Sequence, residues 1–159
     1  MERITLKSLC AALLLLGAGA GQITAQPILR LPSIIGDHMV LQANSNVKIW
    51  GWAEPNKEVL IIPSWSQDTV RTKSTGDTKW LASIQTPAAD NRTYTLTVQT
   101  QQRKIEVKDI LVGQVWLCGG QSNMNYSAAQ GITDMQEELQ KPMNPTIRLF
   151  TVTRNSSPW

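Results

Sequence analysis

The amino-acid sequence predicts a mixed architecture, in which an N-terminal antiparallel β-sandwich is followed by the beginning of an α/β domain. Six short segments with strand character, separated by turn-forming residues, lie between residues 27 and 108. After Asp109 an apolar segment that ends in glycines is followed by a helical segment and a second apolar segment. An α/β layer begins in this order, with strand, helix and strand. The predicted units are a signal peptide (1–25), a β-sandwich domain (27–108) and the truncated beginning of a second domain (109–159).

The first 25 residues have the composition of a bacterial-type signal peptide. Arg3 and Lys7 form a basic start, and Leu9 to Ala20 is an apolar stretch, shorter than the roughly 20 residues that span a membrane. Small residues at Ala20 and Ala25 offer two cleavage sites, and an uncleaved anchor is the alternative. We therefore expect an exported protein, periplasmic or secreted, with no stable membrane insertion after cleavage.

Composition argues against several classes of partner and cofactor. The formal net charge is +3 and falls to +2 without the leader, which is too little to attract nucleic acid. Cleavage also removes Cys10 and leaves Cys118, which we expect to be a buried and inert thiol. No Cys and His cluster or acidic loop has the spacing of metal ligands, so we predict no metal and no other cofactor.

The strand predictions for the first domain depend on period-two alternation and on turn chemistry. Tyr94, Leu96 and Val98 alternate with polar residues, as do Ile105 and Val107. Proline, glycine, asparagine and aspartate lie between the segments, where turns need them. The expected strands are Val47 to Trp52, Glu58 to Ile62, Thr69 to Lys73, Trp80 to Gln85, Tyr94 to Gln99 and Arg103 to Lys108.

Four tryptophans in this domain have two interpretations. Trp50, Trp52, Trp65 and Trp80 are ordinary core residues of a β-sandwich, and this is the interpretation that we favour. They also have the composition of a sugar-stacking face, which would make the chain a non-catalytic carbohydrate-binding module. Binding of glycans that perturbs tryptophan fluorescence would distinguish the second interpretation.

The second domain is expected to begin with a buried strand from Ile110 to Cys118. A glycine turn follows, and Ser122 comes next, at the expected entry to a helix. In that position a serine is either a plain N-cap or a displayed nucleophile, and the local pattern leaves both open. Further along, a helix is expected over Thr133 to Gln140 and a second strand over Ile147 to Val152.

A serine nucleophile needs a base and an orienting acid, and the chain supplies few candidates. His38 is the only histidine, and it lies in the β-rich part. We expect a structural role for it, and the alternative is a base that acts across the two domains. Asp134, Glu137 and Glu138 are the acids that follow Ser122, and they fall in the expected helix, where a solvated face is the default.

Several blocks in order resemble the sialate O-acetylesterases, a family of the SGNH hydrolase superfamily. Gly120 to Met124, read after Val115 to Cys118, resembles the nucleophile block of that family. The other similar blocks are Gly36 to Gln42, Trp50 to Pro55, Ile110 to Trp116 and Ile147 to Phe150. Two positions depart from the family pattern, because Gln114 and Asn125 stand where an acidic residue is common.

The resemblance implies a serine esterase that removes O-acetyl groups from sialic acid or related acetylated carbohydrates. It implies that Ser122 is the nucleophile that forms an acetyl-enzyme, with its backbone N–H in the oxyanion hole, and that Gln121 and Asn123 contact the substrate. The strand, helix and strand after Asp109 would then be the beginning of an SGNH-type domain. The family's histidine and acidic partner come from a later block, so we expect an N-terminal fragment that is inactive alone.

Overall fold

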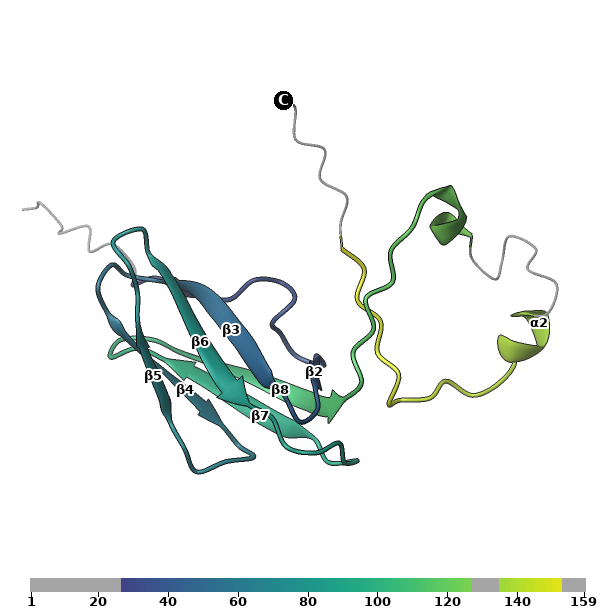
Figure 1. The fold of residues 1–159 in the computed structure, drawn as a ribbon, viewed down its shortest axis with the longest axis horizontal. Coiled ribbons are helices and arrows are strands. Elements are labelled where there is room, and N and C mark those ends of the chain that lie inside the picture. The colour runs from purple at the N-terminus through teal and green to yellow at the C-terminus, as the bar shows by residue number, and fades with distance from the viewer. Residues whose placement is uncertain (1–26, 127–134, 153–159) are drawn as a thin grey trace, which may run out of the picture.

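The computed structural model describes residues 27–126 and 135–152, and this part of the chain is mostly β-sheet with very little helix (Figure 1). The strands are β1 (Leu29–Arg30), β2 (Val40–Gln42), β3 (Asn46–Ala53), β4 (Glu58–Pro63), β5 (Val70–Lys73), β6 (Lys79–Gln85), β7 (Tyr94–Gln99) and β8 (Lys104–Gly113). The helical segments are the 3₁₀-helix η1 (Ser122–Asn125) and the short helix α2 (Met135–Glu138).

The described strands form two sheets, ordered β1-β3-β6 and β2-β8-β7-β4-β5. Strand β2 pairs with β8 in parallel, whereas the other described pairs are antiparallel. The larger sheet is therefore mixed, and the prediction of a purely antiparallel arrangement is wrong for β2. The turn before β2 explains its direction, because His38 N–H bonds to the Lys108 carbonyl and Leu111 N–H bonds to the Met39 carbonyl. These bonds align β2 with the second half of β8.

The two sheets share one hydrophobic core. Every second side chain of a strand points inward, so that exposed and buried residues alternate along the whole of β6. The largest fully buried side chains come from both sheets: Ile49, Ile61, Ile84, Leu96, Ile110, Val59 and Val98. Burial of these apolar groups is the main driving force for the folding of this part of the chain.

Thr86 is a buried polar residue that ties the chain together beside the core. It is 2% exposed, and its hydroxyl donates to the Gln42 carbonyl at 2.7 Å. The same oxygen accepts the Ser45 N–H at 3.0 Å. Because both hydrogen-bonding roles of the hydroxyl are satisfied, its burial carries little penalty, and the end of β2 is held near the end of β6.

Strand β8 continues through the position where the sequence suggests a second domain. Tyr94 pairs with Ile110 while Leu96 pairs with Val107, so the register shifts at a bulge that contains Asp109. Asp109 has a φ of 53°, in the left-handed region that aspartate tolerates better than most residues. The predicted separate strand from Ile110 is therefore the second half of β8, and the boundary predicted at 109 falls inside a strand.

The described residues after Gly113 contain little regular structure. The strand predicted to reach Cys118 ends at Gly113, and Trp116 and Leu117 are 82% and 98% exposed. Cys118 is exposed as well, which corrects the expectation of a buried thiol. The predicted strand over 147–152 is not formed. A parallel strand needs neighbours and a cover on both faces, and the described part of the chain provides neither for these residues.

Of the helix predicted over 133–140, the described residues 135–140 form only the single turn α2. Thr133, the expected cap, lies outside the described residues, as does the predicted signal peptide over 1–25. No helix within the described ranges is both long enough and apolar enough to cross a membrane.

Candidate functional site

Ser122 opens the 3₁₀-helix η1, nine residues beyond the end of β8. Gln121, in an extended conformation, holds the N-cap position, and its carbonyl accepts the Met124 N–H at 3.0 Å. Ser122 is therefore not the N-cap that one interpretation of the sequence suggested. Gln121, Ser122 and Asn123 are consecutive and exposed, so the structure places the three predicted site residues together on an accessible turn.

Two contacts shape the segment that leads to Ser122. The Gln42 side-chain oxygen accepts the Val115 N–H at 2.9 Å, which ties the start of the segment to β2. At Gly120 a Cβ would lie 2.7 Å from Met124 Cγ, so glycine allows the turn to close against that side chain. The turn thus exposes the Ser122 hydroxyl and the first N–H groups of η1, which have no partners inside a helix.

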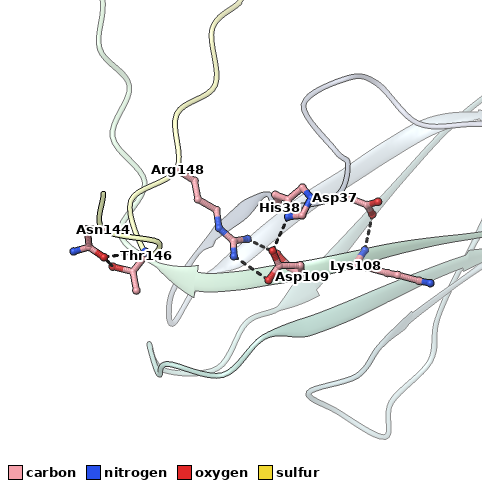
Figure 2. Close-up of polar contacts among 7 residues, drawn as sticks. All are labelled: Asp37, His38, Lys108, Asp109, Asn144, Thr146 and Arg148. Atoms are coloured by element: carbon pink, nitrogen blue, oxygen red, sulfur yellow. Dashed lines mark hydrogen bonds and ion pairs between the residues drawn. The ribbon is translucent and has the colours of Figure 1, made fainter. Parts of the chain in front are cut away.

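His38 lies in a different cluster, at the bulge of β8 (Figure 2). Its Nδ1 is 2.5 Å from Asp109 Oδ2. Arg148 approaches the same residue from the other side, because one guanidinium nitrogen is 2.9 Å from Asp109 Oδ1 and the other bonds to the Asp109 carbonyl. Asp109 therefore joins the turn before β2 to the segment after α2. The predicted structural role of His38 agrees with this contact, since its ring engages Asp109 and not Ser122.

The backbone around His38 supports this cluster. His38 has a φ of 67°, and its N–H bonds to the Lys108 carbonyl at 3.0 Å. The neighbouring Asp37 carboxylate accepts the Lys108 N–H at 2.7 Å (Figure 2). The turn and the bulge are thus joined by reciprocal bonds, and the His38 ring is held at the Asp109 carboxylate.

Asp109 is the electrostatic centre of the cluster. The hydrogen bond with His38, and then the one from Arg148, lowers the pKa of the Asp109 carboxyl below its ordinary value. Partial burial opposes this shift with a smaller effect. The charged form of Asp109 is therefore favoured in the folded chain, and the Arg148 side chain, 18% exposed, is neutralised by it.

This shift predicts an acid-sensitive contribution to stability. When the pKa of a carboxyl is lower in the folded chain than in the unfolded chain, its ionisation stabilises the fold at pH values above the unfolded pKa. This stabilisation is lost as the pH falls through the folded-state pKa. Asp109→Asn is therefore expected to lower the free energy of unfolding at pH 7, with a difference from the parent that shrinks below about pH 4. Urea unfolding between pH 7 and about pH 2.5 measures it, with the exposed Asp77→Asn as control. A difference that stays constant over this range contradicts the assignment.

Sequence reasoning did not find the link between Asp109 and Arg148. Two signals were present: Asp109 is the one acid at the junction of two strand patterns, and Arg148 is the one charge in an apolar segment. A lone charge in an apolar segment needs a partner when it is partly buried. Nothing in the sequence indicates which of the many acids that partner is.

The tryptophans divide between the two interpretations. Trp80 is 3% exposed and belongs to the core, and Trp65 packs edge-on against Tyr94 with its indole N–H on the Gln85 carbonyl. Trp50 and Trp52 instead lie on the outward face of β3, and Trp50 is 39% exposed. The prediction of core packing is therefore correct for Trp80 and wrong for Trp50.

Metal binding receives no support from the described side chains. Within residues 27–126 and 135–152, no group of three His, Cys, Asp or Glu residues is close enough to hold a metal ion. The site residues that remain are the hydroxyl of Ser122 and the amides of Gln121 and Asn123. A hydroxyl and amides suit acyl transfer, in which an oxygen attacks a carbonyl and N–H groups bind the developing oxyanion.

Comparisons with known proteins give relatives but no family model, because none matches the chain. The chain is 29% identical to the sialate O-acetylesterase of Mus musculus over 133 residues, 78% of this chain and 24% of that protein. It is 30% identical to the Homo sapiens sialate O-acetylesterase over 134 residues, 78% of this chain and 25% of that protein. The crystal structure of a carbohydrate acetylesterase from Xanthomonas citri matches with a TM-score of 0.60 and 32% identity, over 70% of this chain and 25% of that one.

These relatives carry acetylesterase names, and their identities extend over most of this chain. The chain spans about a quarter of the length of the relatives that it matches. The resemblance inferred from the motif blocks is thereby confirmed: over most of its length, this chain is homologous to the sialate O-acetylesterases.

Proposed function

We propose that this chain carries the nucleophile of a serine esterase that removes O-acetyl groups from sialic acid or related acetylated carbohydrates. The observation that carries the proposal is the homology to acetylesterases together with the exposed Ser122 hydroxyl at the start of η1. Gln121 and Asn123 flank the nucleophile on the same exposed turn and supply amide groups to orient the substrate.

In the proposed reaction, Ser122 Oγ attacks the acetyl carbonyl carbon while a general base removes the hydroxyl proton. The tetrahedral oxyanion is stabilised by N–H donors, including that of Ser122 at the first turn of η1. Collapse breaks the bond to the sugar oxygen, which takes the proton back, and leaves an acetyl group on Ser122. Water then attacks this ester with the same base, so that acetate leaves and the serine is restored.

The base in this scheme comes from outside residues 1–159. Within the described residues, the one histidine of the chain, His38, hydrogen-bonds to Asp109 at the β8 bulge and makes no hydrogen bond to Ser122, the contact that a general base needs. We therefore propose that these 159 residues alone turn over esters slowly or not at all, because a serine without a base is a weak nucleophile.

Covalent trapping tests the assignment of Ser122. A fluorophosphonate, which reacts with activated serines, is expected to phosphonylate Ser122 in the full-length protein and to leave the exposed Ser33 unmodified. Tandem mass spectrometry of the peptides locates the adduct. Complete inactivation with the adduct on another residue would refute Ser122 as the nucleophile.

We also propose that the protein is exported, as a periplasmic or secreted enzyme, through a signal peptide over residues 1–25. The basic start, the short apolar stretch and the small residues before Gln26 support this. Expression in a bacterial host is expected to give a mature N-terminus at Gln26, measured by intact mass. A mature protein that retains Met1 and stays in the cytoplasm contradicts the proposal.

A further inference from the structure

The outward face of the small sheet carries an unusual set of side chains. In β3 the residues Ile49, Gly51 and Ala53 point to the core, so that Trp50 and Trp52 point away from it. In β6, which pairs with β3, Leu81 points outward opposite Trp50 and is 54% exposed. Lys79 lies opposite Trp52, and Arg30 of β1 lies opposite Trp52 on its other side. We call these five outward residues (Arg30, Trp50, Trp52, Lys79 and Leu81) the Trp50–Trp52 face.

A shallow hollow of about 430 Å³ lies at this face. Its lining includes Trp50, Trp52, Lys79 and Leu81, with Gly51 and Trp80 contributing between them. The volume is in the range of sites that hold small ligands. Large apolar side chains are rarely left outward in a cluster on a sheet, and when they are, the cluster commonly marks a binding surface.

The charges around the hollow are of one sign. Arg30, Lys48 and Lys79 are outward on β1, β3 and β6, and no residue of these three described strands is acidic. The Arg30 guanidinium lies 5.7 Å from the Trp52 ring centroid, which places it beside the hollow. The nearest acids along the sequence, Glu54 and Asp77, belong to turns beyond the strand ends.

These features together specify a ligand chemistry. Indole faces stack on the apolar C–H surface of a ring, while a guanidinium and an ammonium bind a carboxylate. A sugar that carries a carboxylate offers both groups in one residue. We propose that the Trp50–Trp52 face binds an acidic sugar, namely a terminal sialic acid of a glycan, at a site separate from Ser122. The choice of sialic acid as the sugar rests on the proposed function. The arrangement of side chains on the face is independent of that function.

Binding of a sugar without an acetyl ester tests the site independently of the esterase chemistry. The 159-residue chain is titrated with 3′-sialyllactose, with lactose as the neutral control, and tryptophan fluorescence and calorimetry are recorded. Saturable binding in the millimolar range is expected, with lactose weaker by about threefold or more, because exposed charge pairs contribute modestly. Ser122→Ala is expected to leave this binding unchanged, so failure of the nucleophile assignment and failure of this site remain distinguishable.

Variants locate the site. Trp50→Ala is expected to weaken 3′-sialyllactose binding by about tenfold, the effect of removing a stacking ring. Lys79→Gln is expected to weaken it by about threefold, whereas Lys73→Gln, an exposed lysine on β5 of the other sheet, should have no effect. Thermal unfolding is used to check that each variant is folded. If Trp50→Ala does not fold, Lys79→Gln still tests the site.

Three results would overturn the proposal. The first is no saturable response up to about 50 mM 3′-sialyllactose, a concentration far above weak lectin-like binding. The second is equal binding of lactose, which would remove the role of the carboxylate. The third is binding of anionic phospholipid vesicles that is lost in Trp50→Ala while the sugar does not bind, which would identify a membrane surface as the partner.

Discussion

Replacing Ser122 with alanine in the full-length protein is expected to lower kcat for an O-acetylated sialic acid by about 10⁴- to 10⁶-fold. In the proposed mechanism the hydroxyl oxygen bonds to the acetyl carbon, so its removal abolishes the covalent route rather than weakening a contact. Residual turnover comes from substrate orientation and oxyanion stabilisation alone. Steady-state release of acetate measures the effect.

The expected pattern of the kinetic constants separates this role from a structural one. Ser122 is exposed at the start of η1, so alanine there should leave the melting temperature and KM nearly unchanged. Ser33→Ala, at another exposed serine, is the matched control and should keep full activity. Substitution of Gln121 or Asn123 is expected to raise KM by a few-fold. A Ser122→Ala enzyme with activity within tenfold of the parent would remove the serine from the mechanism.

The second large effect is expected at Gly51, in the middle of β3. A Cβ at this position would lie 2.3 Å from the Arg30 carbonyl oxygen and 2.9 Å from Trp80 Cζ2. Neither neighbour can move freely, because Arg30 pairs with Trp52 and Trp80 is 3% exposed in the core. Gly51→Ala is therefore expected to lower the free energy of unfolding by about 3 kcal/mol, the upper range for overpacking.

A second glycine provides the control. A Cβ at Gly76, in the turn between β5 and β6, meets no heavy atom within 4 Å. Gly76→Ala is expected to be neutral or slightly stabilising, because alanine restricts the unfolded chain more than glycine does. Urea unfolding with tryptophan fluorescence compares the two variants with the parent. Equal free energies of unfolding for the two variants would contradict the prediction, because they would show that β1 and Trp80 move to accommodate a methyl group at little cost.

Much of the β architecture follows from the sequence alone. Five of the six predicted strands match β3 to β7 to within one residue at each end, because alternation of apolar and polar residues is local. The two strands that were missed, β1 and β2, are two and three residues long. Such short strands form because they pair with β3 and β8. Pairing with residues that are distant in sequence cannot be recognised from a local pattern.

The segment after Asp109 shows where local reasoning fails. The apolar run from Ile110 predicts a buried strand, but β7 pairs with this run only at Ile110, and β2 pairs with it only as far as Gly113. Beyond that residue apolarity persists while burial does not, because the described residues offer no neighbouring strand. Apolar composition indicates that burial of a segment is favourable, but burial also requires neighbouring residues that pack against it.

The candidate site likewise has one part that could be proposed from the sequence and one part that only the structure shows. Ser122 was proposed as the nucleophile from several ordered blocks of resemblance, because its local pattern left an N-cap and a nucleophile open, and the exposed turn is compatible with the proposal. The contacts of Asp109 with His38 and Arg148 join positions 71 and 39 residues apart, so only the folded chain reveals them. The lone histidine was expected to have a structural role because of its place in the β-rich part, and its partner Asp109 could not be identified from the sequence.

The edges of the two sheets have a consequence for self-association. Three of the described edge strands, β1, β2 and β5, have only two to four residues, so each offers little unpaired backbone to another copy. The fourth edge is the longer β6, where the Thr72 hydroxyl of β5 donates to the Leu81 carbonyl at 2.9 Å. That bond occupies one carbonyl of β6, the longest of the four edge strands. The three short edges and the occupied carbonyl of β6 thus reduce the backbone that is available for strand pairing with a second copy.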